Sequence, residues 1–128
     1  MAKVYVANLG GHDLSDAERF GELVFLTTRG YRPKYLERVL FEVMEQLRHF
    51  DPEQDYFLPV GQDFINITCM WALTQMHDEI TVLYWDFPEQ KYIVKTYTPR
   101  LFHQITRNLK LREELEKHDR FARHLKPY

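Results

Sequence analysis

The chain has 128 residues, of which 45% are hydrophobic and 15% aromatic, a composition typical of one ordered globular domain with a buried core. The formal net charge of −2 arises from interspersed acids and bases, which gives no electrostatic reason to expect a nucleic-acid partner. The single cysteine, Cys69, excludes an internal disulfide and a four-cysteine metal site.

Hydropathy points to a soluble protein. No stretch of the chain reaches the roughly 18 apolar residues of a membrane-spanning helix, and the apolar start is too short for a secretory signal. We therefore expect no membrane partner and a reducing, cytoplasmic setting, which is the host cytoplasm if the protein is viral.

The first half of the chain predicts two strands and two helices. A nearly continuous apolar run favours a first strand that is covered on both faces. Ser15 and Glu18 have the spacing of a capping box, which predicts the start of a short helix. The predicted elements are, in order, the strand Lys3–Leu9, the helix Asp16–Phe20, the strand Glu22–Thr28 and an amphipathic helix from Pro33 to Asp51-Pro52.

The second half predicts three strands around one helix. The helix is apolar nearly all round, so we expect it to be buried, shared between the sheet and another subunit. Pro59 lacks a backbone donor, so strand pairing should end or bulge there. The predicted elements are the strand Tyr56–Val60, the helix Asp63–Met76, the strand Ile80–Trp85, a hairpin loop at Phe87–Gln90 and an outer strand, Lys91–Tyr97.

The last segment starts at Pro99 and has an apolar face that shifts phase near Asn108. This pattern predicts either one long bent helix or two short ones. The segment from Arg107 to Lys126 contains seven bases and four acids. This excess of bases suits an acidic partner or RNA, although a solvated helical face explains the same pattern. The apolar positions are Leu101, Phe102, Ile105, Leu109, Leu111, Leu115, Ala122 and Leu125.

Alternation of strands and helices predicts a single α/β domain over residues 1–128. We expect a three-layer Rossmann-like fold with a mainly parallel sheet of about five strands. An antiparallel hairpin should form one edge of this sheet. The C-terminal helical segment, 99–128, should pack on the domain or mediate contacts.

Two glycine-containing loops form the candidate ligand site. If the first and third strands are parallel neighbours, the loops after them meet at one edge of the sheet, where open α/β sheets bind ligands. Free N–H groups at the start of the first helix would also suit an anion. The predicted ligand-binding residues are Gly10, Gly11, His12, Asp13, Gly61, Gln62, Asp63 and Asn66.

Several of these residues also have a purely structural explanation. Gly10-Gly11 can simply permit a tight turn, and His12-Asp13 can be a solvated pair. Asp63 can serve only as the N-cap of the helix that follows it.

Catalysis is not the leading prediction. His12 and Asp13 are the only candidates for acid–base chemistry, and no nucleophile accompanies them, since Ser15 is better used as a cap and Cys69 lies in an apolar helix. If the protein is an enzyme, it is a hydrolase or transferase acting on a nucleotide-like substrate. Spacing typical of metal ligands is missing, so we predict no metal and no cofactor.

Aromatic residues gather around the predicted hairpin. Such a set is more often core or interface than a platform that stacks bases, and exposed aromatics there would favour self-association. The residues are Tyr84, Trp85, Phe87, Tyr92 and Tyr97.

The opening residues, KVYVANLGGHDLSDAERFGELVFLT, resemble the start of small α/β proteins that are common among tailed-phage genomes. The likeness covers the first third of the chain and implies a phage protein without assigned chemistry. A strand followed by a polar turn also resembles Rossmann-like domains of the nucleoside deoxyribosyltransferase type, which bind nucleosides at strand ends. The nucleophilic glutamate of that family matches no position here, so its activity is not carried over.

Two functional hypotheses follow. The first is a small α/β binding protein, a phage accessory protein, that holds a nucleotide-like or anionic ligand between the two loops. The alternative is a self-assembling or partner-binding protein without a small-molecule ligand, which would use the aromatic hairpin and the C-terminal helix. In both cases we expect a homo-oligomer or a protein partner.

Overall fold

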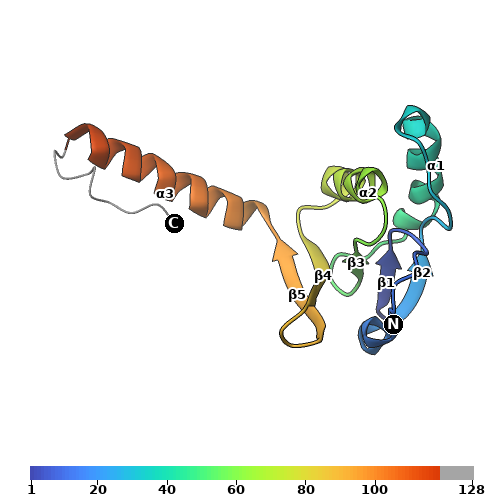
Figure 1. Cartoon of the computed structure of the whole chain (residues 1–128). Coiled ribbons are helices and arrows are strands. Elements are labelled where there is room, and N and C mark those ends of the chain that lie inside the picture. The colour runs from blue at the N-terminus through green and yellow to red at the C-terminus, as the bar shows by residue number, and fades with distance from the viewer. Residues whose placement is uncertain (119–128) are drawn as a thin grey trace. The chain divides into compact units, whose positions relative to one another are not determined.

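The structure is a computed structural model that describes residues 1–118 (Figure 1). The chain forms two compact units, Met1–Tyr97 and Thr98–Tyr128. The first unit, called the sheet domain below, contains every strand among the described residues. Up to His118, where the described residues end, the second contains one helix, α3 (Pro99–His118).

The sheet has five strands in the order β2-β1-β3-β4-β5. The first four are mutually parallel, and β5 runs antiparallel to β4. The predicted α/β class, with a mainly parallel sheet and an antiparallel edge pair, is therefore confirmed. The strands are β1 (Lys3–Val6), β2 (Glu22–Phe25), β3 (Tyr56–Leu58), β4 (Ile80–Asp86) and β5 (Lys91–Tyr97).

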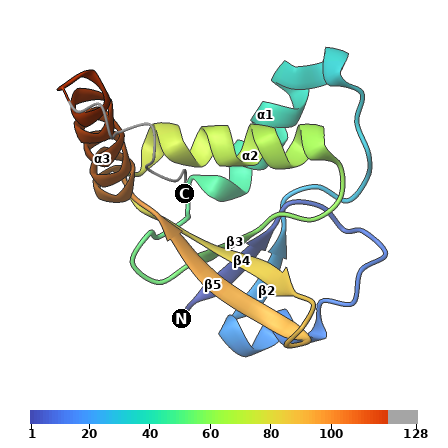
Figure 2. The same cartoon turned by 60° about the vertical axis from the view of Figure 1, so that its left-hand side comes forward.

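Two helices cover one face of the sheet and a short 3-10 helix lies on the other (Figure 2). The first face carries α1 (Leu36–Leu47), preceded by the 3-10 turn η2 (Pro33–Tyr35), and α2 (Asp63–Met76). The second carries η1 (Ser15–Phe20), which contacts β1, β2 and β5.

Strand alternation divides the core between these two faces. Tyr5 and Ala7 pack with α1 and α2, whereas Val4 and Val6 pack with Leu14 and Ala17 of the η1 region. β1 is buried on both sides, as its apolar run predicts.

Several local predictions are wrong in detail. Ser15 and Glu18 do not form a capping box, because the Ser15 N–H donates to the Asp13 carboxylate and η1 has no side-chain cap. Asp63 is not the N-cap of α2: Gln62 takes that position, and no side-chain cap bond forms there. β3 ends at Leu58, one residue before Pro59, as the missing donor predicts.

The apolar composition of α2 predicts a helix that is buried on all sides. In the structure one side of it is exposed. Ile65, Cys69 and Leu73 are fully buried, but Ile67 and Trp71 are 69% and 53% exposed. Helical spacing puts the two exposed residues one turn apart on a single outward face.

The last segment forms one helix up to His118, the first of the two alternatives that its pattern left open. The predicted continuation through Ala122 and Leu125 lies outside the described residues. How the C-terminal segment relates to the sheet domain stays a prediction.

Candidate functional site

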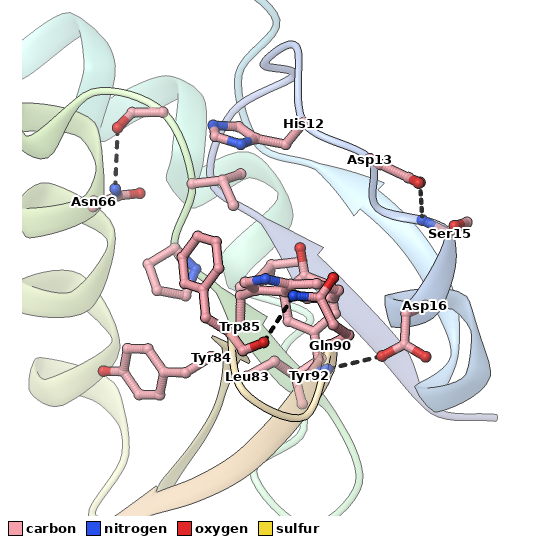
Figure 3. Close-up of a pocket in the computed structure, with 15 residues that line it drawn as sticks. His12, Asp13, Ser15, Asp16, Asn66, Leu83, Tyr84, Trp85, Gln90 and Tyr92 are labelled. Atoms are coloured by element: carbon pink, nitrogen blue, oxygen red, sulfur yellow. Dashed lines mark hydrogen bonds between the residues drawn. The ribbon is translucent and has the colours of Figure 1, made fainter.

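A pocket of about 630 Å³ lies at the carboxyl ends of β1, β3 and β4 (Figure 3). The pocket lies at the boundary between β1 and β3 in the sheet order. From β1 the chain continues to β2 on one side of this boundary, and from β3 it continues to β4 on the other side. The two connections also lie on opposite faces, through η1 and α2. This is the point where strand order reverses in an open α/β sheet, the usual position of a ligand.

The loops after β1 and β3 are in direct contact. A Cβ atom added to Gly61 would lie 2.9 Å from Cβ of Asn8, and the Gly61 backbone has φ = 87°, a conformation that side chains rarely adopt. The Asn8 amide in turn donates to the Arg29 carbonyl at 2.9 Å. Glycine at position 61 thus lets the two loops approach each other.

The loop after β1 supplies the polar wall of the pocket. Asp13 Oδ1 accepts from the Ser15 N–H at 3.0 Å, and this bond lowers the pKa of Asp13. Asp16 Oδ2 accepts from the Tyr92 N–H at 2.8 Å, which lowers the pKa of Asp16, with a smaller effect from Arg19. Both groups are therefore carboxylates at neutral pH.

Asp16 and Arg19 also hold η1 against the edge strand. Arg19 Nη2 donates to the Tyr92 carbonyl at 2.7 Å, so the two side chains occupy both backbone groups of Tyr92. These groups face away from β4 and would otherwise be open to pairing with another chain. One wall of the pocket is in this way fixed to the hairpin that forms the other.

The β4–β5 hairpin supplies the aromatic wall. Trp85 and Tyr92 face each other across the strand pair, with ring centroids 5.1 Å apart at 70°. Phe87 follows in the turn and is 76% exposed. Burial, and to a smaller extent the charges of Asp13 and Asp16, raises the pKa of Tyr92.

Asn66 closes the pocket on the side of α2 (Figure 3). Its Nδ2 donates to the Gly61 carbonyl across a long 3.5 Å, and its Oδ1 is buried without a hydrogen-bond partner among the described residues. An unpaired buried amide oxygen costs free energy, so this side chain lacks one of the hydrogen bonds that it can make.

Half of the predicted site residues line the pocket. His12, Asp13, Gly61 and Asn66 do so, and the predicted adjacency of their two loops is observed. Gly10 and Gly11 form the turn before His12 and do not line it. The remaining two, Gln62 and Asp63, are also outside the lining, and Gln62 Oε1 instead accepts from the Tyr31 N–H at 2.7 Å.

The hairpin and η1 residues of the lining are missing from the sequence prediction. The sheet topology could have indicated the hairpin residues. Because β4 is parallel to β3, the turn that follows β4 must lie at the same edge of the sheet as the loop after β3. The lining residues outside the prediction are Ser15, Asp16, Leu58, Pro59, Val60, Leu83, Tyr84, Trp85, Phe87, Gln90 and Tyr92.

The charges of the pocket decide which ligands suit it. Two carboxylates line it, and lysine and arginine do not occur among its lining residues. The Ser15 N–H, which an anion at this helix start would use, is already bound to Asp13. A bare anion is therefore disfavoured at this pocket.

Groups for covalent or metal chemistry are scarce in the part of the chain that the structure describes. Cys69 is buried, which raises the pKa of its thiol to about 12 and makes it a poor nucleophile. Three or more metal-binding side chains do not gather anywhere within residues 1–118.

Fold and site together define an α/β protein with an open, aromatic and acidic pocket at the carboxyl ends of its parallel strands. Residues 2–99 match the family model described as Phage Pam3 gp32-like protein, and the chain belongs to this family of phage proteins. The matched residues cover the sheet domain and end where α3 begins. No curated protein and no solved structure matches the chain. The likeness to Rossmann-like domains stays a prediction.

Within residues 1–118, none of the helices combines the length and the apolar character needed to cross a bilayer.

Proposed function

We propose that the protein is a phage accessory protein that binds a nucleoside-like molecule in the pocket between the β1 and β3 loops. The observation that carries this proposal is the position of the pocket, at the reversal of strand order, with carboxylates on one wall and aromatic rings on the other. Membership of a phage family favours the host cytoplasm as its setting.

The aromatic wall suits a flat ring. Trp85 is 37% exposed although its ring packs against Tyr92, so part of its surface is open to a ligand. Stacking of a base on an aromatic side chain is worth about 1–3 kcal/mol and tolerates different bases.

The polar wall suits sugar hydroxyls or ring amino groups. Asp13 lines the pocket, and its carboxylate can accept from a ligand in addition to the Ser15 N–H that Oδ1 binds. The Asn66 amide lies across the pocket and would gain a partner for its buried oxygen. These groups favour the nucleoside part of a nucleotide over its phosphate. The sequence predicts a nucleotide-like or anionic ligand, and of these two the proposal keeps only the nucleotide-like one, without its phosphate.

Isothermal titration calorimetry of the full chain tests the proposal. The probes are the four ribonucleosides, their deoxy forms and the corresponding monophosphates. We expect at least one nucleoside to bind, and its monophosphate to bind more weakly because the phosphate meets two carboxylates.

Two tryptophan variants locate the binding. Trp85→Ala should weaken it roughly 5- to 150-fold, as the loss of one stacking contact predicts. Trp71→Ala removes the other tryptophan, on the outward face of α2, and should leave the affinity unchanged. The proposal fails if none of the nucleosides binds, or if both variants weaken binding equally.

A further inference from the structure

A second hollow of the sheet domain is lined by bases. Its volume is about 310 Å³, and its lining comes from the segment between the end of β2 and the first turn of α1. Arginines make up three of the six lining residues and tyrosines two, and none is acidic. All six belong to the sheet domain. The members of this basic pocket are Arg29, Gly30, Tyr31, Arg32, Tyr35 and Arg38.

Side chains from other parts of the sheet domain hold the backbone of this segment. The Asn8 amide donates to the Arg29 carbonyl at 2.9 Å, and Gln62 Oε1 accepts from the Tyr31 N–H at 2.7 Å. A Cβ atom added to Gly30 would lie 3.2 Å from the same Gln62 oxygen, so the segment packs closely against the loop after β3. The basic pocket is therefore built on a fixed backbone, which lowers the entropy cost of ordering its side chains around a ligand.

A contact within the pocket orients one of the three guanidinium groups. Arg29 Nε donates to the Tyr31 hydroxyl at 3.2 Å, and Arg29 Cζ lies 5.0 Å from the centre of the Tyr31 ring. A guanidinium has five N–H donors. Arg29 can therefore bind a ligand while it keeps its bond to Tyr31.

Acidic side chains lie beside the basic pocket and do not neutralise it. Glu42 and Glu45 line a neighbouring hollow that shares Arg29, Tyr31 and Arg38 with the basic pocket. Glu42 accepts a hydrogen bond from the Tyr31 hydroxyl. Within the sheet domain, none of the three pocket arginines forms a salt bridge.

The sequence concentrates positive charge at this place. Residues 29–38 contain four bases and one acid, although the whole chain has a net charge of −2. Lys34 is the fourth base, beside the three pocket arginines. Arg38 lies in the first turn of α1, where the helix dipole disfavours a base. Like charges at this spacing repel each other, and an anion between them would remove the repulsion.

We propose that the basic pocket binds the phosphate group of a phosphate ester. Guanidinium groups bind phosphate oxygens through paired, charge-assisted hydrogen bonds. The two tyrosines offer flat walls against which the organic part of the ester can pack. The ester is a free monoester or the backbone of a single-stranded nucleic acid. The site is independent of the proposed nucleoside site, because the two pockets share no lining residue.

NMR titration of the ¹⁵N-labelled full chain with inorganic phosphate, at constant ionic strength, tests the site. We expect saturable shifts of the Gly30 amide and of the Nε–H signals of Arg32 and Arg38. Inorganic phosphate has no ring to stack in the nucleoside pocket, so the Trp85 indole signal should stay in place. The proposal is overturned if the basic-pocket signals do not shift, or if they shift without saturating.

Two arginine variants separate this site from a general attraction of anions to the surface. Arg38→Gln should weaken phosphate binding about 10-fold or more, because a charge-assisted hydrogen bond is lost. Arg48→Gln removes the same charge at the other end of α1, outside the pocket lining, and should change the affinity little. Equal weakening by both variants overturns the proposal.

A fluorescently labelled single-stranded oligonucleotide made only of abasic sites distinguishes the two sources of the phosphate group. Binding that is tighter than that of inorganic phosphate, and that Arg38→Gln weakens, assigns the pocket to a nucleic-acid backbone. Binding that is no tighter assigns it to a free monoester. If Arg38→Gln changes the binding of neither probe, the proposal is wrong.

Discussion

The two faces of the sheet are built differently, and the difference separates stability from binding. On one face α1 and α2 bury fully covered side chains such as Val39, Val43 and Leu73 against the strands. On the other face the cover is η1, a single 3-10 helix of six residues in which only Ala17 is buried. The thin cover leaves the carboxyl ends of β3 and β4 open, and the pocket lies there.

The pocket therefore lies where no helix of the sheet domain covers the carboxyl ends of β3 and β4. A second long helix on the η1 face would fill the space that Trp85 and Asp13 now line. The polar bonds from Asp16 and Arg19 to Tyr92 hold the short helix in place of a large apolar contact. Substitutions on the covered face should therefore cost more stability than substitutions on the η1 face.

The largest effect is expected from Ile65→Ala on the covered face. Ile65 is fully buried, so its truncation should lower the free energy of unfolding by about 2–5 kcal/mol. Ile67→Ala, on the exposed side of the same helix, should change it by less than about 0.5 kcal/mol. Urea denaturation measures both, and equal losses would contradict the assignment of the two sides of α2.

A smaller loss is expected from Gly21→Ala, where η1 joins β2. An added Cβ would lie 2.4 Å from the Ala2 carbonyl oxygen, so the backbone must shift, at a cost of about 1–3 kcal/mol. Gly11→Ala is the matched control, since an added Cβ there meets nothing within 4 Å. Thermal denaturation compares the two. If Gly11→Ala proves as harmful as Gly21→Ala, the close approach is not what requires glycine.

The smallest effect, and one that depends on pH, is expected from Asp16→Asn. The pKa of Asp16 is lowered in the folded protein, so its charge stabilises the fold above the unfolded pKa of about 3.9. The stability difference between wild type and variant should be present at neutral pH and disappear as the pH falls through the folded pKa. A difference that persists in strong acid would show that the charge is not its cause. Glu18→Gln, at an exposed position of η1, is the control.

Much of the fold is predictable because periodicity reports it directly. The bounds of α2 and β5 agree with the sequence prediction, since an apolar helical run and an alternating strand end at clear turn residues. The start of η1 differs because two side chains compete for one donor: Asp13, two residues before Ser15, takes the N–H that begins the helix.

The candidate site is only partly predictable for a related reason. The meeting of the His12 and Gly61 loops follows from strand order, which the alternation of elements suggests. The partner of Gln62 cannot be predicted from strand order, since the bond between Gln62 and the Tyr31 backbone joins loops that are 31 residues apart. Nor does periodicity tell whether Trp85 faces a core or a pocket, because both faces of β4 carry apolar residues.

The two tryptophans give the most direct test of the central claim that the pocket binds a nucleoside-like ring. Trp85 lines the pocket and Trp71 lies outside it, so their indole N–H signals in a ¹⁵N–¹H NMR spectrum report the two places separately. On addition of an equimolar mixture of the four ribonucleosides, the Trp85 signal and the Gly61 amide should shift while the Trp71 signal stays. A spectrum in which neither tryptophan shifts, or only Trp71 does, would contradict the account.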